Sequence, residues 1–162
     1  MIILGLTGCG FKLRSQASLP TQLHTVFLQT DNPFGQFETS FKKSLKAINI
    51  NLLYKPDPKY LTIALSPTSF TSDNASIGGS IQARVYNLIF SVSFKITDGQ
   101  GKTLVAPQNV TVTRGLTLNP NEVFGASNQV DIVQQSMQQE AITRIFNILS
   151  SKLVFASLAT AS

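Results

Sequence analysis

The feature that most constrains this fold is a pair of long segments, residues 81–97 and 102–118, in which apolar and polar residues alternate. In the first segment the apolar positions are Leu88, Phe90, Val92, Phe94 and Ile96. Alternation places one set of side chains on a core and the other, mainly polar set on the opposite face of a strand. Residues 98–101 (Asp-Gly-Gln-Gly) are typical of a hairpin turn. The pattern predicts one hairpin up to about 50 Å long, roughly two to three times an average strand.

Two irregular stretches lie within and before this hairpin. Pro107 falls in the return segment, and because proline has no N–H for the ladder it predicts an edge strand or a bulge there. The polar residues 68–80 end in Gly78-Gly79 and are typical either of a strand end or of a flexible loop. The sequence leaves these two alternatives open.

The N-terminal half carries a strand, a helix and a second strand in that order. Residues 23–29 and 60–66 are rich in β-branched and aromatic side chains, which predicts the two strands. Residues 31–33 (Asp-Asn-Pro) are typical of a helix start. One apolar stripe follows at helical spacing: Phe34, Phe37, Phe41, Leu45 and Ile48. This order favours a right-handed parallel crossover.

A second amphipathic helix is expected to start near Asn128, with Asp131 in its first turn. Its apolar stripe consists of Val130, Val133, Met137, Ala141, Ile145 and Ile148, extended by Leu149 and Val154. Its opposite face carries Gln134, Gln135, Gln138, Gln139 and Glu140. We therefore expect an α/β fold, with two helices packed on one face of a mixed sheet of about four strands with a long hairpin.

The N-terminus contains the pattern of a lipoprotein signal. An apolar run leads into Leu6-Thr7-Gly8-Cys9, and Cys9 is the only cysteine. A lipidating transferase needs a thiol to alkylate, and the peptidase that follows needs small residues before it. We expect residues 1–8 to be a residual signal peptide and Cys9 to carry acyl chains; a buried cysteine in a strand is the alternative. Because the leader is short and has no Lys or Arg, we expect an upstream start codon or a clipped chain.

Charge is scarce in this chain. Only 13% of its residues are charged, against about 25% in ordinary globular domains. Abundant neutral polar residues on a weakly charged surface indicate that a partner covers much of it. The net charge of +5 favours an acidic counterpart such as a phosphorylated lipid. No basic run with interleaved aromatic residues supports binding of nucleic acid.

The sequence carries no pattern typical of catalysis. It has no glycine-rich phosphate loop, no His-Glu-x-x-His pattern, no cysteine pair and no Gly-x-Ser-x-Gly elbow. His24 is the only histidine, and we expect it to be a strand residue at a sheet edge. The predicted class is therefore a binding or assembly protein with no catalytic residues and no metal site.

The N-terminal residues and the order of the predicted elements resemble those of a known family. Residues 9–14 (Cys-Gly-Phe-Lys-Leu-Arg), followed by Leu19-Pro20, resemble the mature N-terminus of the LPS-assembly lipoprotein family LptE, also called RlpB. The order strand, helix, strand, long hairpin and long helix also resembles this family. Residues 83–87, with a tyrosine before alternating apolar residues, resemble the start of its third strand, and residues 128–137 the start of its closing helix.

This resemblance implies an outer-membrane lipoprotein that is not an enzyme. Members of the family are lipidated, which here implies a lipidated N-terminal segment at residues 9–22 and one α/β domain at residues 23–158. In members of the family the corresponding domain plugs the lumen of the β-barrel LptD, faces the periplasm and the barrel lumen, and aids assembly of the barrel, so the resemblance implies the same role here. The pair inserts lipopolysaccharide into the outer leaflet. The implied partners are an LptD-type barrel and lipopolysaccharide, with no cofactor beyond the covalent lipid on Cys9.

The resemblance also implies basic contacts to lipid phosphates. Members can carry basic side chains in the loop at residues 77–80 and in the turn at residues 124–126, but this sequence has none at either place. Arg84 and Arg114 on the long hairpin are the nearest candidates for lipopolysaccharide binding, with solvated surface arginines as the alternative. A different function, a free periplasmic lipid-carrier or ligand-binding lipoprotein, would need an apolar cavity.

Overall fold

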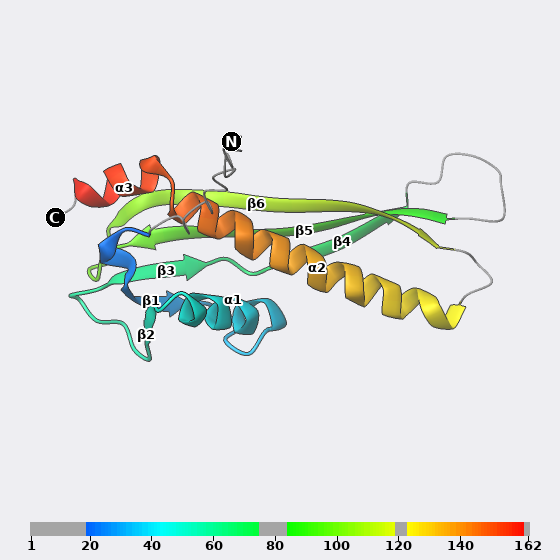
Figure 1. Cartoon of the computed structure of the whole chain (residues 1–162), viewed down its shortest axis with the longest axis horizontal. Coiled ribbons are helices and arrows are strands. Elements are labelled where there is room, and N and C mark those ends of the chain that lie inside the picture. Colours follow the sequence, from blue (N-terminus) through cyan, green and yellow to red (C-terminus); the bar gives the residue numbers. More distant parts are fainter. Residues whose placement is uncertain (1–18, 75–83, 119–122, 161–162) are drawn as a thin grey trace, which may run out of the picture.

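The computed structural model describes residues 19–74, 84–118 and 123–160. In chain order, the elements are η1 (Thr21–Leu23), β1 (Thr25–Gln29), α1 (Gln36–Ala47), β2 (Asn51–Leu53), β3 (Leu61–Leu65), β4 (Ser69–Asn74), β5 (Arg84–Thr97), β6 (Thr103–Leu118), α2 (Val123–Leu149) and α3 (Lys152–Ala159). The strands form one mixed sheet, and α1, α2 and α3 pack against it (Figure 1). The expected α/β class and the long hairpin are confirmed.

Strand β5 joins the two parts of the sheet. It pairs antiparallel with β6 on one side, and on the other side with β3 near its C-terminal end and β4 nearer its N-terminal end. β1 lies parallel between β2 and β3, as the strand–helix–strand order predicts. The sheet has six strands, more than expected. The short segment β2 adds an edge, and Pro67 separates β3 from β4.

The link between β3 and β4 explains why the polar stretch at residues 68–80 begins as a strand. Pro67 has no N–H to donate to the ladder, and at this interruption the Ser66 hydroxyl, in place of a backbone carbonyl, accepts a hydrogen bond from the backbone N–H of Ser93 at 2.9 Å. Pairing with β5 then resumes at Ser69. Residues 69–74 are therefore a strand, and Gly78-Gly79 lie outside the described residues.

The predicted hairpin is confirmed. The carboxylate of Asp98 accepts hydrogen bonds from the backbone N–H groups of Gln100 and Lys102 at 2.9 and 2.8 Å, and Gly101 has a φ of 89°. Among the described strands, β6 pairs with β5 alone, so it is an edge strand. The register also shifts between the pairs Phe94↔Gln108 and Ile96↔Val105, which brackets Pro107. Pro107 therefore lies both on an edge strand and at a bulge, the two positions that the sequence predicted as alternatives.

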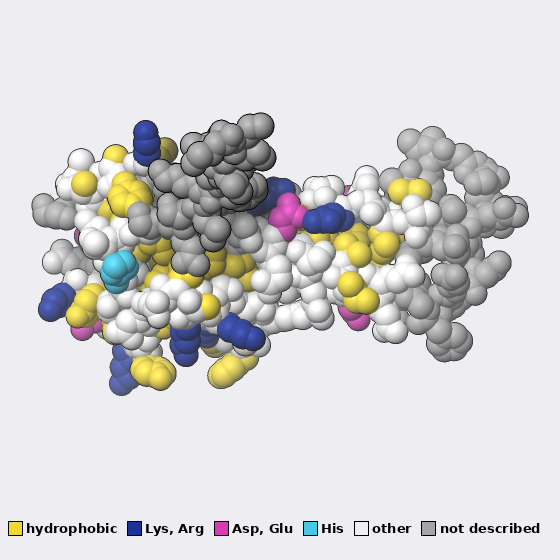
Figure 2. Space-filling view, in the orientation of Figure 1, with side chains coloured by type: hydrophobic (Ala, Val, Ile, Leu, Met, Phe, Trp, Pro, Cys, Tyr) yellow, Lys and Arg dark blue, Asp and Glu magenta, His cyan; other side chains and the backbone are white. Residues whose placement is uncertain are grey.

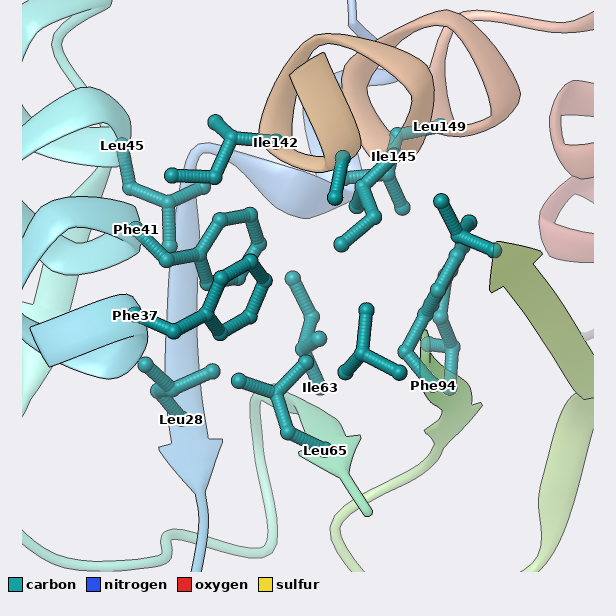
Figure 3. Close-up of a cluster of buried hydrophobic side chains, with 14 of the residues drawn as sticks. Leu28, Phe37, Phe41, Leu45, Ile63, Leu65, Phe94, Ile142, Ile145 and Leu149 are labelled. Carbon is teal, nitrogen blue, oxygen red and sulfur yellow. The ribbon is translucent and has the colours of Figure 1, made fainter. Parts of the chain in front are cut away.

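The core lies between one face of the sheet and the helices. Phe37 of α1 contacts Phe90 of β5 at 5.3 Å between ring centroids, and Phe41 contacts Phe146 of α2 at 5.8 Å. Figure 3 shows side chains of α1 and α2 pointing toward those of β1, β3 and β5. The alternating apolar residues of β5 are all buried in this cluster. The apolar stripes of the two helices pack into this core, so they can be explained without a cavity that holds a carried lipid.

Helix α1 is shorter than its apolar spacing predicts. It begins after Gly35, so Phe34 lies before it and is 93% exposed. It ends at Ala47, where Asn49 adopts a φ of 63° and the N–H of Ile50 returns to the carbonyl of Leu45 at 3.1 Å. This left-handed C-terminal cap turns the chain into β2 and leaves Ile48 at 38% exposure. The stripe therefore consists of Phe37, Phe41 and Leu45 alone.

The C-terminal segment forms two helices where one was expected. α2 starts at Val123, earlier than predicted, and is followed by α3 at an angle of 51°. The Ser151 hydroxyl caps α3 by accepting a hydrogen bond from the N–H of Val154, which is fully buried. Gln138 was expected on the outer face of α2 but is buried.

The molecule has two unlike ends. β1, β2, β3, α1 and α3 gather at one end, whereas β4, the first part of β5, the last part of β6 and the N-terminal part of α2 extend toward the other (Figure 1). β5 and α2 run through both. We call the second, extended part the arm.

Candidate functional site

The arm presents a sheet face made mainly of hydroxyl groups. The register places six small polar side chains on one face of β4, β5 and β6, around the half-buried Ile89: Ser69, Thr71, Ser91, Ser93, Thr111 and Thr113. We call these residues the hydroxyl face. The alternate residues of β5 and of the middle of β6, such as Phe90 and Val112, are buried, and the buried residues of all three α-helices join the core on that other side. The hydroxyl face is thus the side of the sheet opposite the helices.

The hydrogen bond within the hydroxyl face joins two uncharged groups. The hydroxyls of Ser91 and Thr111 lie 3.2 Å apart and form a cross-strand hydrogen bond. Among the described residues on this side of the arm, charged side chains occur only at its margins, at Asp73 of β4 and Lys95 of β5. A surface of this kind can be buried against another polar, neutral surface without removing charges from water.

A cluster of three charged residues lies on the helix side of the arm. Glu140 of α2 accepts hydrogen bonds from Arg114 of β6 and from Arg144 of α2, each at 2.6 Å. Arg144 also donates to the carbonyl of Thr111 at 2.6 Å. The hydrogen bond from Arg114, then that from Arg144, holds the pKa of the Glu140 carboxyl below its usual value. The cluster keeps one excess positive charge.

The predicted site residues are not brought together in one pocket. Arg114 lies opposite Leu88 of β5, whereas Arg84 begins β5 opposite Leu118, about 13 Å away along the strand at about 3.3 Å per residue. Cys9 and residues 77–80 lie outside the described residues. Residues 124–126, expected in a turn, belong to helix α2.

Arg144 is a member of this cluster that the sequence interpretation missed. Its spacing of four residues from Glu140 on a helix is the usual spacing of an ion pair, and this was the available signal. The proximity of Arg114 to Glu140 has no such signal, because it depends on how α2 lies across β6.

Within the described ranges, no three His, Cys, Asp or Glu residues are grouped so that they could hold a metal ion. His24 lies exposed at the end of η1, one residue before β1, and not in the strand itself as expected. No single helix in the described part of the chain is long and apolar enough to cross a membrane. The bent pair Asn128–Leu149 and Lys152–Ala159 passes that test only when taken together, by length and composition.

The family model described as "LptE: Lipopolysaccharide-assembly" matches residues 23–149. This chain belongs to the LptE family. The match runs from the end of η1 to the end of α2, so it includes the whole sheet, α1 and α2, and ends before α3. The resemblance inferred from the N-terminal motif and the order of elements is therefore confirmed.

Curated relatives and solved structures agree with this family. The LPS-assembly lipoproteins LptE of Photorhabdus laumondii and Pectobacterium atrosepticum are each 24% identical to the chain. The alignments cover 90% and 89% of this chain, and 79% and 80% of the relatives. The lipoprotein B structure from Nitrosomonas europaea has a TM-score of 0.73 at 19% identity, and covers 93% of this chain and 96% of its own.

A second solved structure, the rare lipoprotein B of Shewanella oneidensis, has a TM-score of 0.69 at 16% identity. It covers 82% of this chain and 98% of its own. At these identities the two structures support the fold. The family itself rests on the sequence match.

Proposed function

We propose that this LptE-family chain is a lipid-anchored outer-membrane protein that fills the lumen of an LptD-type β-barrel. In this role it aids assembly of the barrel and insertion of lipopolysaccharide into the outer leaflet, and it performs no catalysis. The observation that carries this proposal is the hydroxyl face of the arm. Lumens of large outer-membrane barrels are polar, so a plug needs a surface that pairs with polar groups.

The physical argument is the low cost of burying this face. Hydroxyl groups lose hydrogen bonds to water on burial but regain them from a polar wall, whereas each unpaired charge would be far more expensive. Only 13% of the residues are charged, which agrees with a surface that is permanently covered by a partner. A freely diffusing carrier would gain nothing from this composition.

The proposed membrane anchor is Cys9. Removal of residues 1–8 would make it the first residue, and residues 9–22 would connect the lipid to the domain at residues 23–158. One acyl chain binds a membrane only reversibly. Three chains, at about 0.8 kcal/mol per buried methylene group, would hold the protein at the outer membrane permanently.

Arg84 and Arg114 remain the proposed contacts to lipopolysaccharide phosphates. Arg114 shares Glu140 with Arg144, so a phosphate there would meet two guanidinium groups and one carboxylate. The excess positive charge of this cluster supports an anionic ligand. Its exposed position on the arm makes it accessible to a lipid that passes along the barrel wall.

The test is co-purification of tagged, full-length protein from its own outer membrane in mild detergent. We expect a stoichiometric barrel of about 80–100 kDa, the size of a barrel with more than 20 strands. The variant Thr71→Lys/Thr113→Lys places two charges on exposed positions of the hydroxyl face and is expected to lower the yield of barrel about tenfold or more. The matched control Thr21→Lys/Gln22→Lys adds the same charge at exposed positions of η1, away from the arm.

Either of two results would contradict the plug. One is a chain that purifies alone even after crosslinking in cells. The other is a hydroxyl-face variant that folds, as checked by circular dichroism, and still retains the barrel as well as the control does. The first result would leave the free lipid carrier as the working function.

A further inference from the structure

A groove is lined by residues of helix α1 and of the parallel strands β1 and β2. These elements lie at the end of the molecule opposite the tip of the arm (Figure 1). The volume of the groove is about 770 Å³, within the range of pockets that hold small ligands. The residues that line it include the last part of β1 and of β2. The lining also includes Lys46, Asn49 and Ile50, so the groove follows the whole length of β2 and reaches the last turn of α1.

The wall formed by α1 is positively charged. Lys42 and Lys46, one helical turn apart, both line the groove, and no Asp or Glu does. The ammonium of Lys42 donates one hydrogen bond to the carbonyl of Pro33 at 2.7 Å, which leaves two N–H groups free to bind a ligand. Like charges at this spacing destabilise a helix, and an anion between them relieves that repulsion. Among the described residues, neither lysine is ion-paired with a carboxylate.

The rest of the groove combines apolar side chains with the uncharged polar residues Gln29, Thr30, Asn49 and Asn51. Phe27, Ile50 and Leu52 line it, and Tyr54 stands at its margin with 98% of its surface exposed. Figure 2 shows Lys or Arg side chains beside exposed hydrophobic ones along the lower edge of this end of the molecule. Exposed tyrosine next to lysine is typical of surfaces that meet lipid, because both side chains combine an apolar body with a polar tip.

We propose that this groove binds a phosphate-bearing lipid, with one acyl chain on the apolar side and the phosphate between Lys42 and Lys46. An apolar ligand without charge would leave the two ammonium groups unpaired. A free phosphate would leave the apolar surface in water. An acidic peptide added to the sheet edge is less suited, because β2 offers only three residues for pairing. The site is distinct from Arg84 and Arg114, and the proposal stands whether or not the chain fills a barrel.

The chain contains no tryptophan, so one introduced tryptophan is a clean reporter. In the full-length chain carrying Cys9→Ser, which prevents acylation, Tyr54→Trp places the reporter at the groove. The probe is lysophosphatidylglycerol with a brominated acyl chain, used below its critical micelle concentration, because bromine quenches tryptophan at short range. We expect saturable quenching. Leu153→Trp, on exposed α3, is the control and is expected to show little quenching.

The charge requirement is tested with lysine variants. Lys42→Gln/Lys46→Gln is expected to raise the dissociation constant about tenfold in the Tyr54→Trp background, because two charge-assisted contacts to phosphate are lost. Lys43→Gln/Lys55→Gln removes the same charge from two exposed lysines that do not line the groove, and is expected to bind like the parent. Brominated lysophosphatidylcholine, with no net charge, is expected to bind about tenfold more weakly.

Three results would overturn the proposal: equal quenching at Leu153→Trp, unchanged binding by Lys42→Gln/Lys46→Gln, or displacement of the probe by inorganic phosphate at the same concentration as by unlabelled lipid. Competition then identifies the source of the ligand. Displacement by lipid A assigns the site to lipopolysaccharide, and its failure assigns it to glycerophospholipid; both support a phosphate-bearing lipid. Lys42→Gln/Lys46→Gln is expected to keep its barrel partner, so loss of this site and loss of the plug function give different results.

Discussion

Gly99 marks the place where the hairpin turn meets another turn of the chain. A Cβ atom at Gly99 would overlap the backbone of Pro58. The backbone cannot yield as a side-chain tip would, so the two turns fit only because Gly99 lacks a side chain. Through this contact the end of β5 is fixed to the segment that precedes β3.

Replacing Gly99 by alanine should therefore destabilise the protein. We expect Gly99→Ala to lower the free energy of unfolding by about 1–3 kcal/mol, the usual effect of overpacking. Gly115→Ala is the control, because a Cβ there meets no atom within 4 Å and alanine suits a strand better than glycine. Urea denaturation measures both, and equal stability of the two variants would contradict the close approach of the turns.

Glu140 should make stability depend on pH. Its pKa is lowered in the folded protein, so its stabilising contribution is present above its unfolded pKa and is lost as pH falls through the folded pKa. We expect Glu140→Gln to be less stable than the parent near neutral pH, and the difference to shrink in acid. Urea denaturation of both proteins from neutral to acidic pH measures this difference in stability. A difference that does not change with pH would contradict the lowered pKa of Glu140. Arg114→Gln and the double variant test the coupling.

Strand β5 holds the core through one face only. Phe90 is buried against Phe37, whereas the neighbouring Ile89 lies half-buried on the face opposite the helices. We expect Phe90→Ala to lower the free energy of unfolding by about 3–5 kcal/mol. Ile89→Ala on the same strand should have a clearly smaller effect. Chemical denaturation compares the two, and similar losses would mean that both faces of β5 are equally packed.

Helix α3 begins after the break with a side-chain cap at Ser151. Ser151 satisfies the N–H of Val154 at the start of α3, and Val154 and Leu158 then enter the core. Ser151→Ala is expected to lower stability by about 1 kcal/mol, because the free N–H loses its partner. Ser157→Ala, inside α3, is the control. Thermal unfolding detects this difference, and no change relative to Ser157→Ala would show that the break does not need the cap.

At the scale of elements, the sequence predicts what periodicity alone decides. The alternation in residues 88–96, the turn at residues 98–101 and the stripe through Met137, Ala141 and Ile145 are all confirmed. Periodicity fails where a local cap overrides it. Phe34 and Ile48 fit the stripe of α1 by spacing. The helix nevertheless begins only after Gly35 and ends before the left-handed turn at Asn49, so it includes neither of them.

Other features depend on contacts between distant segments, which no spacing reveals. Gln138 is buried although Gln135 and Gln139, which belong to the same polar face of the predicted helix, are exposed. The pairing of Arg114 with Glu140 needs the crossing of α2 over β6. The groove beside Lys42 and Lys46 exists because α1 leaves part of β2 uncovered. Spacing alone shows only that Lys42 and Lys46 lie off the apolar stripe of α1, which does not distinguish a contact to phosphate from a solvated helix face.

At the scale of the whole molecule, the two ends should differ in local stability. β3 lies between β1 and β5 and packs Ile63 and Leu65 into the core, whereas β4 pairs with β5 and its first five residues include four exposed ones. We expect backbone amides of β4 to exchange with solvent faster than those of β3, because exchange follows local opening. Hydrogen–deuterium exchange measures this, and equal protection would mean that the arm opens only with the whole fold.

The long outer strand of the hairpin has a consequence for cells that make this protein. Within the described residues, the sixteen-residue β6 pairs on one side only, which leaves a row of backbone donors and acceptors that can template pairing with another copy. The kink at Pro107 interrupts that row, but the stretch from Gln108 onward carries no proline and only one charge, at Arg114. Chains produced in excess over whatever covers this edge are therefore at risk of aggregation, so the amount synthesised has to follow the supply of that covering surface.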